Sequence, residues 1–184
     1  MPTQPSQPGA RAPDALALLK ADHDTVRDLF LAFEQLKDTH DMDERKAELV
    51  DDICYALTLH TMIEEEIVYP ALRDATDAGA LLDEADIEHA GARELIGQLE
   101  LMYPGDDHFD ATVTVLGAEV VHHIGKEENA VFAAARASGI DLDALGARLS
   151  ARRAQLDDDL SAPPQTMDAM DVHAGTRGQP RAPN

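Results

Sequence analysis

The sequence predicts an all-α fold, an antiparallel up-down-up-down four-helix bundle with a short fifth helix at its C-terminal side. Apolar residues recur at spacings of three and four in each long segment, and no segment shows sustained period-2 alternation. Short breaks separate the long segments, which favours antiparallel neighbours. Hydrophobic residues make up 44% of the 184 positions, but aromatic residues make up only 4% and Trp is absent. An aliphatic core of this kind suits helix-on-helix packing.

Five helices are expected in chain order. The first begins at Asp14, which follows a proline and favours a first helical turn. The third stops before Pro104, and the fourth begins with Asp106 or Asp107 as its N-cap and ends before Gly139. The expected helices cover about 14–37, 43–74, 78–102, 107–137 and 142–158.

One folded domain, residues 14–160, is predicted between two disordered tails, residues 1–13 and 161–184, because both tails are rich in proline and small polar residues. The chain carries 36 Asp+Glu against 15 Lys+Arg, and its formal net charge is −21. Such acidity argues against binding to nucleic acid or to an anionic membrane. No stretch approaches the ~18 apolar residues of a membrane span. With a single cysteine, Cys54, and no signal-peptide pattern, we expect a cytoplasmic protein.

Each of the four long helices carries one histidine near the middle of its apolar face, and two of them carry a glutamate one turn later. Counting along each helix from the nearest break, at ~1.5 Å per residue, places these polar residues at one level of the bundle to within about one helical turn. The apolar faces continue beyond the glutamates to Ala71 and Ala134. The six polar residues expected to face the interior together are His23, His60, Glu64, His89, His123 and Glu127.

A layer of buried carboxylates and imidazoles requires a positive partner, because each buried polar group without one costs roughly several kcal/mol. A bound metal supplies that partner. Histidine with carboxylate suits iron, manganese or zinc better than calcium or magnesium. Six ligands are too many for one tetrahedral zinc, and they suit two metals, each with two histidines, bridged by both glutamates. Redox-active iron fits best, with an oxo or hydroxo bridge and a position left for an exogenous ligand, whereas manganese and zinc fit less well.

The chain also shows an internal duplication. A helix with one central histidine is followed by a helix with His-x-x-x-Glu, first at His23 and His60 and then at His89 and His123. The separations within the two halves are similar. Two duplicated halves make a pseudo-symmetric dinuclear site a natural outcome.

Four segments resemble the hemerythrin-like (HHE cation-binding) domain family. They are ADHDTVRDLF (21–30), LHTMIEEEIVYPAL (59–72), EADIEHAGARELI (84–96) and HHIGKEENAVF (122–132). The resemblance covers roughly residues 14–137. It implies a four-helix bundle that holds a non-haem di-iron centre, with His23, His60, Glu64, His89, His123 and Glu127 as the ligands.

The sequence departs from the respiratory members of this family on the third helix. These have a His-x-x-x-His pair there, whereas here His89 is followed four residues later by Arg93. A missing fifth nitrogen argues against reversible oxygen carriage and leaves a more open iron. Sequence and resemblance together predict a protein that binds or reacts with O2, NO or peroxide, with enzymatic turnover left open. A second departure is that the fourth motif lacks the proline that often follows the equivalent of Phe132.

Several polar residues next to the expected ligands are expected to support them, to pack in the core or to face solvent. Glu65 and Glu128 are interpreted as solvated or as supporting the ligands from outside, and Glu65 would replace Glu64 if its helix were rotated. Tyr69 is expected to lie near the metals, where it could quench oxidants, with packing as its main role. Asp22 and Glu88 each precede a ligand histidine and are expected to face solvent.

Three alternatives remain open at the level of the sequence. The first is a non-catalytic metal-binding or sensing module that acts through a partner protein. The second is an iron storage or delivery module. The third is a metal-free helical bundle in which the histidines are core residues satisfied by hydrogen bonds.

Overall fold

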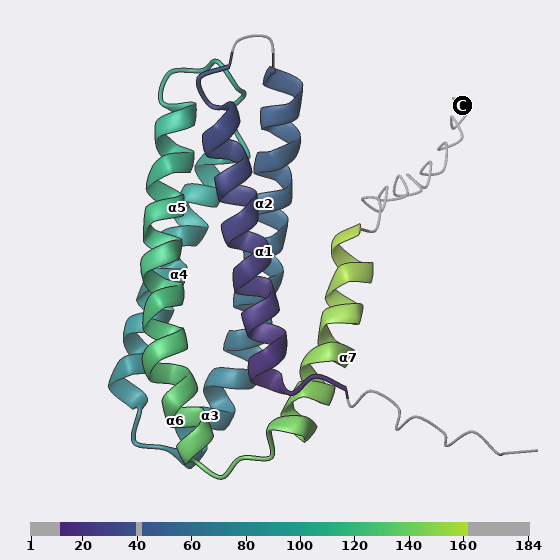
Figure 1. Ribbon diagram of the computed structural model, residues 1–184, viewed down its shortest axis with the longest axis vertical. Helices are drawn as coiled ribbons and strands as arrows, with labels where there is room; N and C mark the ends of the chain where they lie inside the picture. The colour runs from purple at the N-terminus through teal and green to yellow at the C-terminus, as the bar shows by residue number, and fades with distance from the viewer. Residues whose placement is uncertain (1–11, 40–41, 162–184) are drawn as a thin grey trace, which may run out of the picture.

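The computed structural model describes residues 12–39 and 42–161, and this part of the chain is all helical. Figure 1 shows the long helical rods side by side with a further helix next to them, and the predicted bundle is confirmed. The rods are α1 (Ala15–Leu36), α2 (Asp43–Ile63) continued by η1 (Glu64–Val68) and α3 (Tyr69–Ala75), α4 (Gly79–Leu99), and α5 (Phe109–Lys126) continued by η2 (Glu127–Val131) and α6 (Phe132–Ala137). The further helix is α7 (Leu142–Ser161), which has 20 residues, about the length of α4. No helix in the described ranges combines the length and apolarity needed to cross a membrane.

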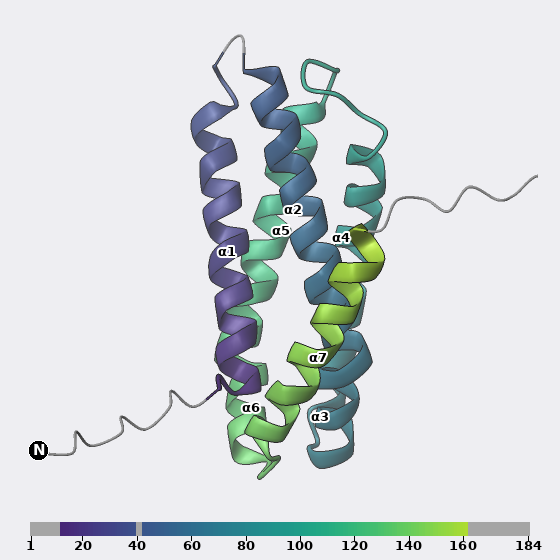
Figure 2. The same cartoon turned by 90° about the vertical axis from the view of Figure 1, so that its right-hand side faces the viewer.

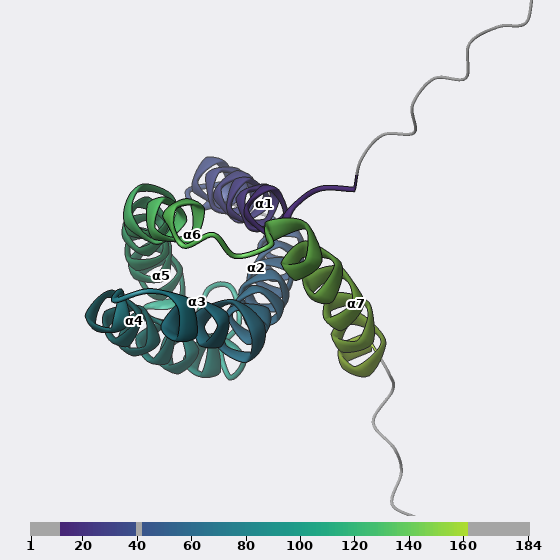
Figure 3. The same cartoon turned by 90° about the horizontal axis from the view of Figure 1, so that it is seen from below.

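Helix α7 lies outside the bundle. Seen along the bundle axis, the four rods surround a common interior and α7 packs beside α1 and α2 (Figure 3). Figure 2 shows α7 crossing that face obliquely. Its apolar side, formed by Leu145, Leu149 and Leu156, is buried in the core. The fifth helix is therefore part of the folded unit.

The core is divided by a polar layer. In α1, Leu16 and Leu19 belong to one apolar cluster, and Val26 and Phe30 belong to the other. His23 lies between them and is fully buried. The two apolar clusters stabilise the bundle on either side of a layer that is costly to bury.

The helix ends match the prediction in one case and differ in two. Asp14 caps α1, and its carboxylate accepts a hydrogen bond from a backbone N–H in the first turn. The N-cap of α5 is His108, with φ of 73°, so the predicted cap at Asp106 or Asp107 is wrong. The Asp106 carboxylate instead accepts the Tyr103 N–H and closes the preceding turn. Helix α4 ends at Leu99, a few residues before the expected end.

Two stretches of π-helix interrupt the rods, and the sequence pattern did not predict them. The Tyr69 N–H bonds to the Glu64 carbonyl, and the Phe132 N–H bonds to the Glu127 carbonyl, five residues back in each case. Each π turn accommodates one extra residue and rotates the following helix. As a result Leu72 and Ala135 are the buried residues.

This rotation corrects the uniform α-helical pattern, which placed Ala71 and Ala134 in the core. Both alanines are only half-buried. Proline does not explain the π turns, because Pro70 follows the first one but Ala133 holds the equivalent position after the second. The shared feature is that each π turn begins at a buried glutamate.

A close approach of α7 to the start of α1 depends on Gly146. A Cβ at this position would lie 2.8 Å from the Ala15 nitrogen and 2.9 Å from the Pro13 oxygen. We predict that Gly146→Ala lowers the free energy of unfolding by about 1–3 kcal/mol, because two backbones must separate. Gly97→Ala is the control, since nothing lies within 4 Å of its Cβ and alanine favours the helix by about 0.5–1 kcal/mol. Urea denaturation of both variants measures this, and equal stability of the two would contradict it.

Candidate metal centre

Six polar side chains from the four rods meet in the middle of the bundle, as the sequence predicted. None of them is more than 7% exposed. One comes from α1, one from α4, and two from each of the rods that contain a π turn. They are His23, His60, Glu64, His89, His123 and Glu127.

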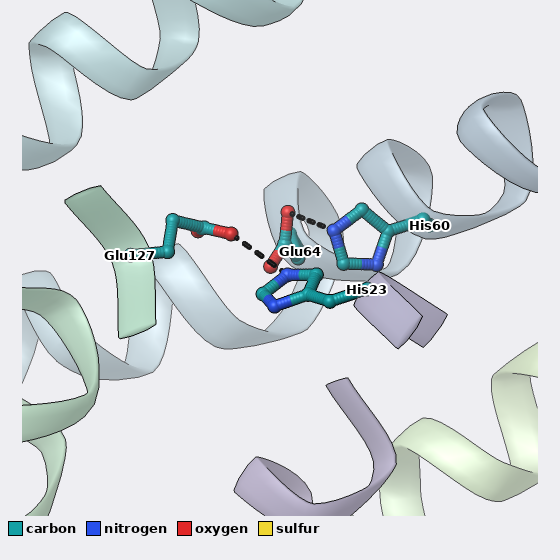
Figure 4. Close-up of side chains that lie close together, drawn as sticks. All are labelled: His23, His60, Glu64 and Glu127. Carbon is teal, nitrogen blue, oxygen red and sulfur yellow. Dashed lines mark hydrogen bonds and ion pairs between the residues drawn. The ribbon is translucent and has the colours of Figure 1, made fainter. Parts of the chain in front are cut away.

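Four of these residues form a first group, in which one potential ligand atom from each lies within 4.8 Å of the others. Figure 4 shows His23, His60, Glu64 and Glu127 pointing toward one another. His23 Nε2 lies 3.1 Å from Glu127 Oε2, and His60 Nε2 lies 3.2 Å from Glu64 Oε2. The group therefore combines two imidazole nitrogens and two carboxylates around one point.

Glu64, His89 and His123 form a second group that overlaps the first. Glu64 Oε2 lies 3.4 Å from His89 Nε2, and Glu127 Oε2 lies 3.4 Å from His123 Nε2. Each glutamate thus contacts one histidine of each half of the layer. Each of the two groups could hold a metal cation, and Glu64 belongs to both.

The two carboxylates differ in charge. Burial raises the pKa of Glu64 well above its usual range, and the neighbouring Glu127 raises it further. Burial also acts to raise the pKa of Glu127, but hydrogen bonds to His123 and His23 outweigh it and bring that pKa well below the usual range. In the metal-free protein Glu64 accordingly holds a proton that Glu127 lacks.

The imidazoles of His89 and His123 differ in their affinity for a proton. Burial and the adjacent His123 lower the pKa of His89 to about 4. Burial also acts to lower the pKa of His123, but contacts with Glu127 and Glu88 outweigh it and raise that pKa. The two Nε2 atoms lie 3.0 Å apart. At this distance two facing lone pairs would repel each other, so a proton or a cation must lie between the two nitrogens.

Unpaired buried atoms show that the donor set suits a cation. His60 Nε2 and Glu64 Oε1 are buried and have no hydrogen-bond partner, and His60 Nδ1 has none within normal geometry. Buried polar atoms without partners cost free energy. A metal ion placed among them would satisfy nitrogen and carboxylate donors together. The cluster therefore fits a metal cation by the chemistry of its donors.

The six side chains that meet in the bundle form an inner ring. Behind this ring, a carboxylate and a cation support His23. Its Nδ1 lies 3.0 Å from Glu128 Oε1, which accepts a hydrogen bond of 2.8 Å from Arg27. An imidazole that donates from Nδ1 to a carboxylate keeps the Nε2 lone pair free for a metal. Glu128 therefore orients the histidine from outside, one of the two roles considered for it from the sequence.

The same arrangement recurs at His89. Its Nδ1 lies 2.9 Å from Glu65 Oε1, and Arg93 donates to the same oxygen. Glu65 therefore orients a histidine, while Glu64 holds the inward position, so the rotated helix considered above does not occur. Arg93 is exposed and directed to Glu65. It adds no donor to the inner ring.

A third carboxylate and cation support His123. Its Nδ1 lies 2.8 Å from Glu88 Oε2, and Lys126 donates to Glu88 Oε1 at 2.7 Å. The expectation that Glu88 and Asp22 face solvent is wrong, because Glu88 is only partly exposed and Asp22 is buried at 8% exposure. Both carboxylates turn toward a histidine on the neighbouring rod.

A repeated pattern could have identified these supporting residues. Asp22-His23 is followed at the fourth position by Arg27, and Glu88-His89 is followed at the fourth position by Arg93. An acid, a histidine and an arginine at the same spacing in both halves indicate that the charge arrangement is repeated within the duplication.

Tyr69 touches the inner ring directly. Its hydroxyl donates to Glu127 Oε1 at 2.8 Å and lies 3.4 Å from both Glu64 Oε2 and His89 Nε2. Burial and the two glutamates raise the pKa of Tyr69, so the hydroxyl stays protonated and acts as a donor. Its ring is 1% exposed and also packs in the core.

Comparison with known proteins gives one family and two relatives. The Hemerythrin HHE cation binding domain family matches residues 14–135. A protein of Nostoc sp. described as a DNA nickase is 29% identical over 119 residues, covering 65% of this chain and 32% of that protein. The chain thus spans about a third of this curated relative. A solved hemerythrin HHE cation-binding domain-containing protein from Mycobacterium kansasii has a TM-score of 0.66 at 22% identity, covering 81% of this chain and 93% of that one, which shows the same fold.

Metal binding should release protons from this site. The raised pKa values of Glu64 and His123 mean that both groups hold protons at mildly acidic pH, and a metal must displace them. We predict that the apparent affinity for Co²⁺ falls as the pH is lowered from 7.5 to 5, by about tenfold per pH unit for each proton displaced.

Calorimetry in buffers with different heats of ionisation measures the proton release directly. A binding heat that is independent of the buffer, together with an affinity that is independent of pH, would contradict the assignment of these protons.

Proposed function

The chain belongs to the Hemerythrin HHE cation binding domain family, and from that premise we propose that it is a non-haem di-iron protein that binds or reacts with a small ligand such as O2, NO or peroxide. The observation that carries the proposal is the overlap of the two donor groups at Glu64. With Glu127 also in contact with a histidine of each half, two ions can share both carboxylates.

In this proposal His23 and His60 would hold one ion and His89 and His123 the other, with Glu64 and Glu127 available to both. Imidazole and carboxylate donors together suit iron. When bound, a pair of iron ions supplies redox chemistry and open coordination positions for a small ligand. The absence of a histidine at Arg93 supports reaction with a ligand more than reversible oxygen carriage, because it leaves fewer protein donors on one ion.

An apolar cavity supports a small, uncharged ligand. A cavity of about 330 Å³ reaches the histidine side of the cluster and is lined by residues of all four rods. Its walls include Val26, Leu57, Ala92 and Val120. Apolar walls admit O2, NO or hydrogen peroxide with little desolvation and disfavour charged ligands.

The protein's own residues orient the donors and limit their protonation. Tyr69 keeps its proton and donates to Glu127 Oε1, which fixes one carboxylate oxygen.

The nickase activity of the Nostoc relative does not extend to this proposal. The chain spans about a third of that protein, and the chain's net charge of −21 repels nucleic-acid phosphates.

Iron stoichiometry tests the proposal. We predict that protein loaded anaerobically with Fe²⁺ holds two ions per chain and gives the Mössbauer and magnetic signature of a coupled pair after oxidation. His60→Ala and Glu127→Ala should each reduce the content to one ion or none, because each removes a donor. His122→Ala is the matched control and should keep two, since His122 is exposed beside His123. Wild-type protein that holds one ion or none would overturn the proposal.

The cavity makes a separate prediction about access. Ala92 is 7% exposed and lines the cavity, whereas Ala90 lies on the exposed side of the same helix. We predict that Ala92→Leu slows NO association with the Fe²⁺-loaded protein about tenfold, equivalent to about 1.4 kcal/mol on the barrier, while the iron content stays unchanged. Ala90→Leu should leave the rate unchanged. Stopped-flow measurement of both variants decides this, and equal rates would mean that the ligand enters elsewhere.

A further inference from the structure

The fourth histidine, His60, is supported by a carboxylate of the bundle whose cation comes from outside the bundle. His60 Nδ1 lies 3.5 Å from Asp22 Oδ2, and Arg153 of α7 donates to that same oxygen. In the three other cases described above, the cation that holds the carboxylate comes from a bundle helix. For Asp22 the cation is Arg153, which lies 131 positions from Asp22 along the chain.

The duplication shows why α7 is needed at this point. Asp22 precedes His23 as Glu88 precedes His89, so the carboxylate is matched in both halves. Lys126, which holds Glu88, lies three residues after His123. Three residues after His60 the chain has Ile63, which is 1% exposed and packs in the core. The first half therefore has no cation of its own at the equivalent position.

The contact between Asp22 and Arg153 is the polar link between α7 and the layer of donors. A cavity of about 570 Å³ lies between α7 and the α1–α2 face, and both residues line it. Packing alone therefore leaves room around the Asp22 carboxylate. Asp22 is 8% exposed, and its Oδ2 atom contacts both His60 Nδ1 and the Arg153 guanidinium. A charged group this deeply buried needs a fixed counter-charge.

We propose that α7 is a positioning element of the metal site, in which Arg153 fixes Asp22 and Asp22 in turn orients the imidazole of His60. This inference rests on the proposed function, because it assumes that His60 holds an ion. It makes the docking of α7 and the binding of the ion at His23 and His60 two coupled equilibria. By linkage the coupling is reciprocal: a docked α7 strengthens metal binding, and the bound metal strengthens docking.

Neighbouring Arg152 offers a matched control. It also anchors α7 to the bundle through a charged pair, because its guanidinium bonds twice to Glu66 at 2.6 and 3.0 Å. Glu66 contacts none of the four histidines through a hydrogen bond in the described structure. Loss of Arg152 therefore removes a charged contact of α7, while the buried leucines of α7 keep it docked and Arg153 still holds Asp22.

The test measures stepwise Fe²⁺ dissociation constants by anaerobic competition with a chelator, using the full chain. Arg153→Gln should weaken one of the two Fe²⁺ ions about tenfold and leave the other unchanged, the usual scale for loss of a group that supports a metal ligand. Arg152→Gln should change neither by more than about threefold on the same scale. Arg153→Lys restores the charge and should recover part of the affinity.

A double-mutant cycle keeps the proposal falsifiable if one variant is unstable. Asp22→Asn and Arg153→Gln should each weaken the same ion, and the double variant should weaken it no further than the single variants do, because the two residues act in series. Additive effects of the two changes would overturn the inference.

Hydrogen exchange provides a readout independent of affinity. In wild-type protein, Fe²⁺ loading should slow amide exchange in α7, and Arg153→Gln should abolish this difference. The inference would be overturned if Arg152→Gln and Arg153→Gln weakened Fe²⁺ binding equally, or if neither weakened it. In either case, wild-type protein that binds two Fe²⁺ ions would leave the proposed function intact. Wild-type protein that binds no Fe²⁺ would instead overturn the proposed function.

Discussion

The burial of two carboxylates and four imidazoles inside an aliphatic bundle is the constraint on which the rest of the structure depends. Each of these groups loses water on folding, and unpaired groups of this kind cost several times what one buried methyl group contributes. The structure meets this cost by placing the polar layer between two apolar clusters and by pairing nearly every polar atom with another. Two of the buried atoms left unpaired, His60 Nε2 and Glu64 Oε1, belong to the groups that would hold the proposed ions.

The outer carboxylates solve a second problem, which is the direction of each imidazole. A ring that donates from Nδ1 to an outer carboxylate presents Nε2 inward as an acceptor. Glu128, Glu65 and Glu88 do this at 2.8–3.0 Å, and each is neutralised by a cation on the bundle. Much of the acidity in this region of the chain is therefore compensated locally, and the excess negative charge belongs to the remaining surface.

The internal duplication gives the site its near-symmetry, and α7 breaks it. Both halves share the π turn, the inner glutamate and the outer carboxylates, so two ions would receive similar donors. The halves differ at one cation. Ile63 stands where the second half has Lys126, and Arg153 of α7 supplies the charge that pairs with Asp22. An ion at His60 would consequently be the one whose environment depends on the docking of a helix outside the bundle. The longer contact of 3.5 Å to Asp22 lies at that position.

The sequence by itself determined the bundle, the order of its helices and the six residues of the inner layer. These depend on the 3.6-residue period and on distances from the chain breaks, and both can be read along one dimension. Only the tertiary structure revealed the π turns. Each begins at a buried glutamate, and a proline follows the first turn at Pro70 but not the second, where Ala133 stands. The tertiary structure also decided the roles of Asp22, Glu88 and Arg153. Their partners lie on other helices, and the rotation and tilt that bring them together are set by packing across the whole bundle.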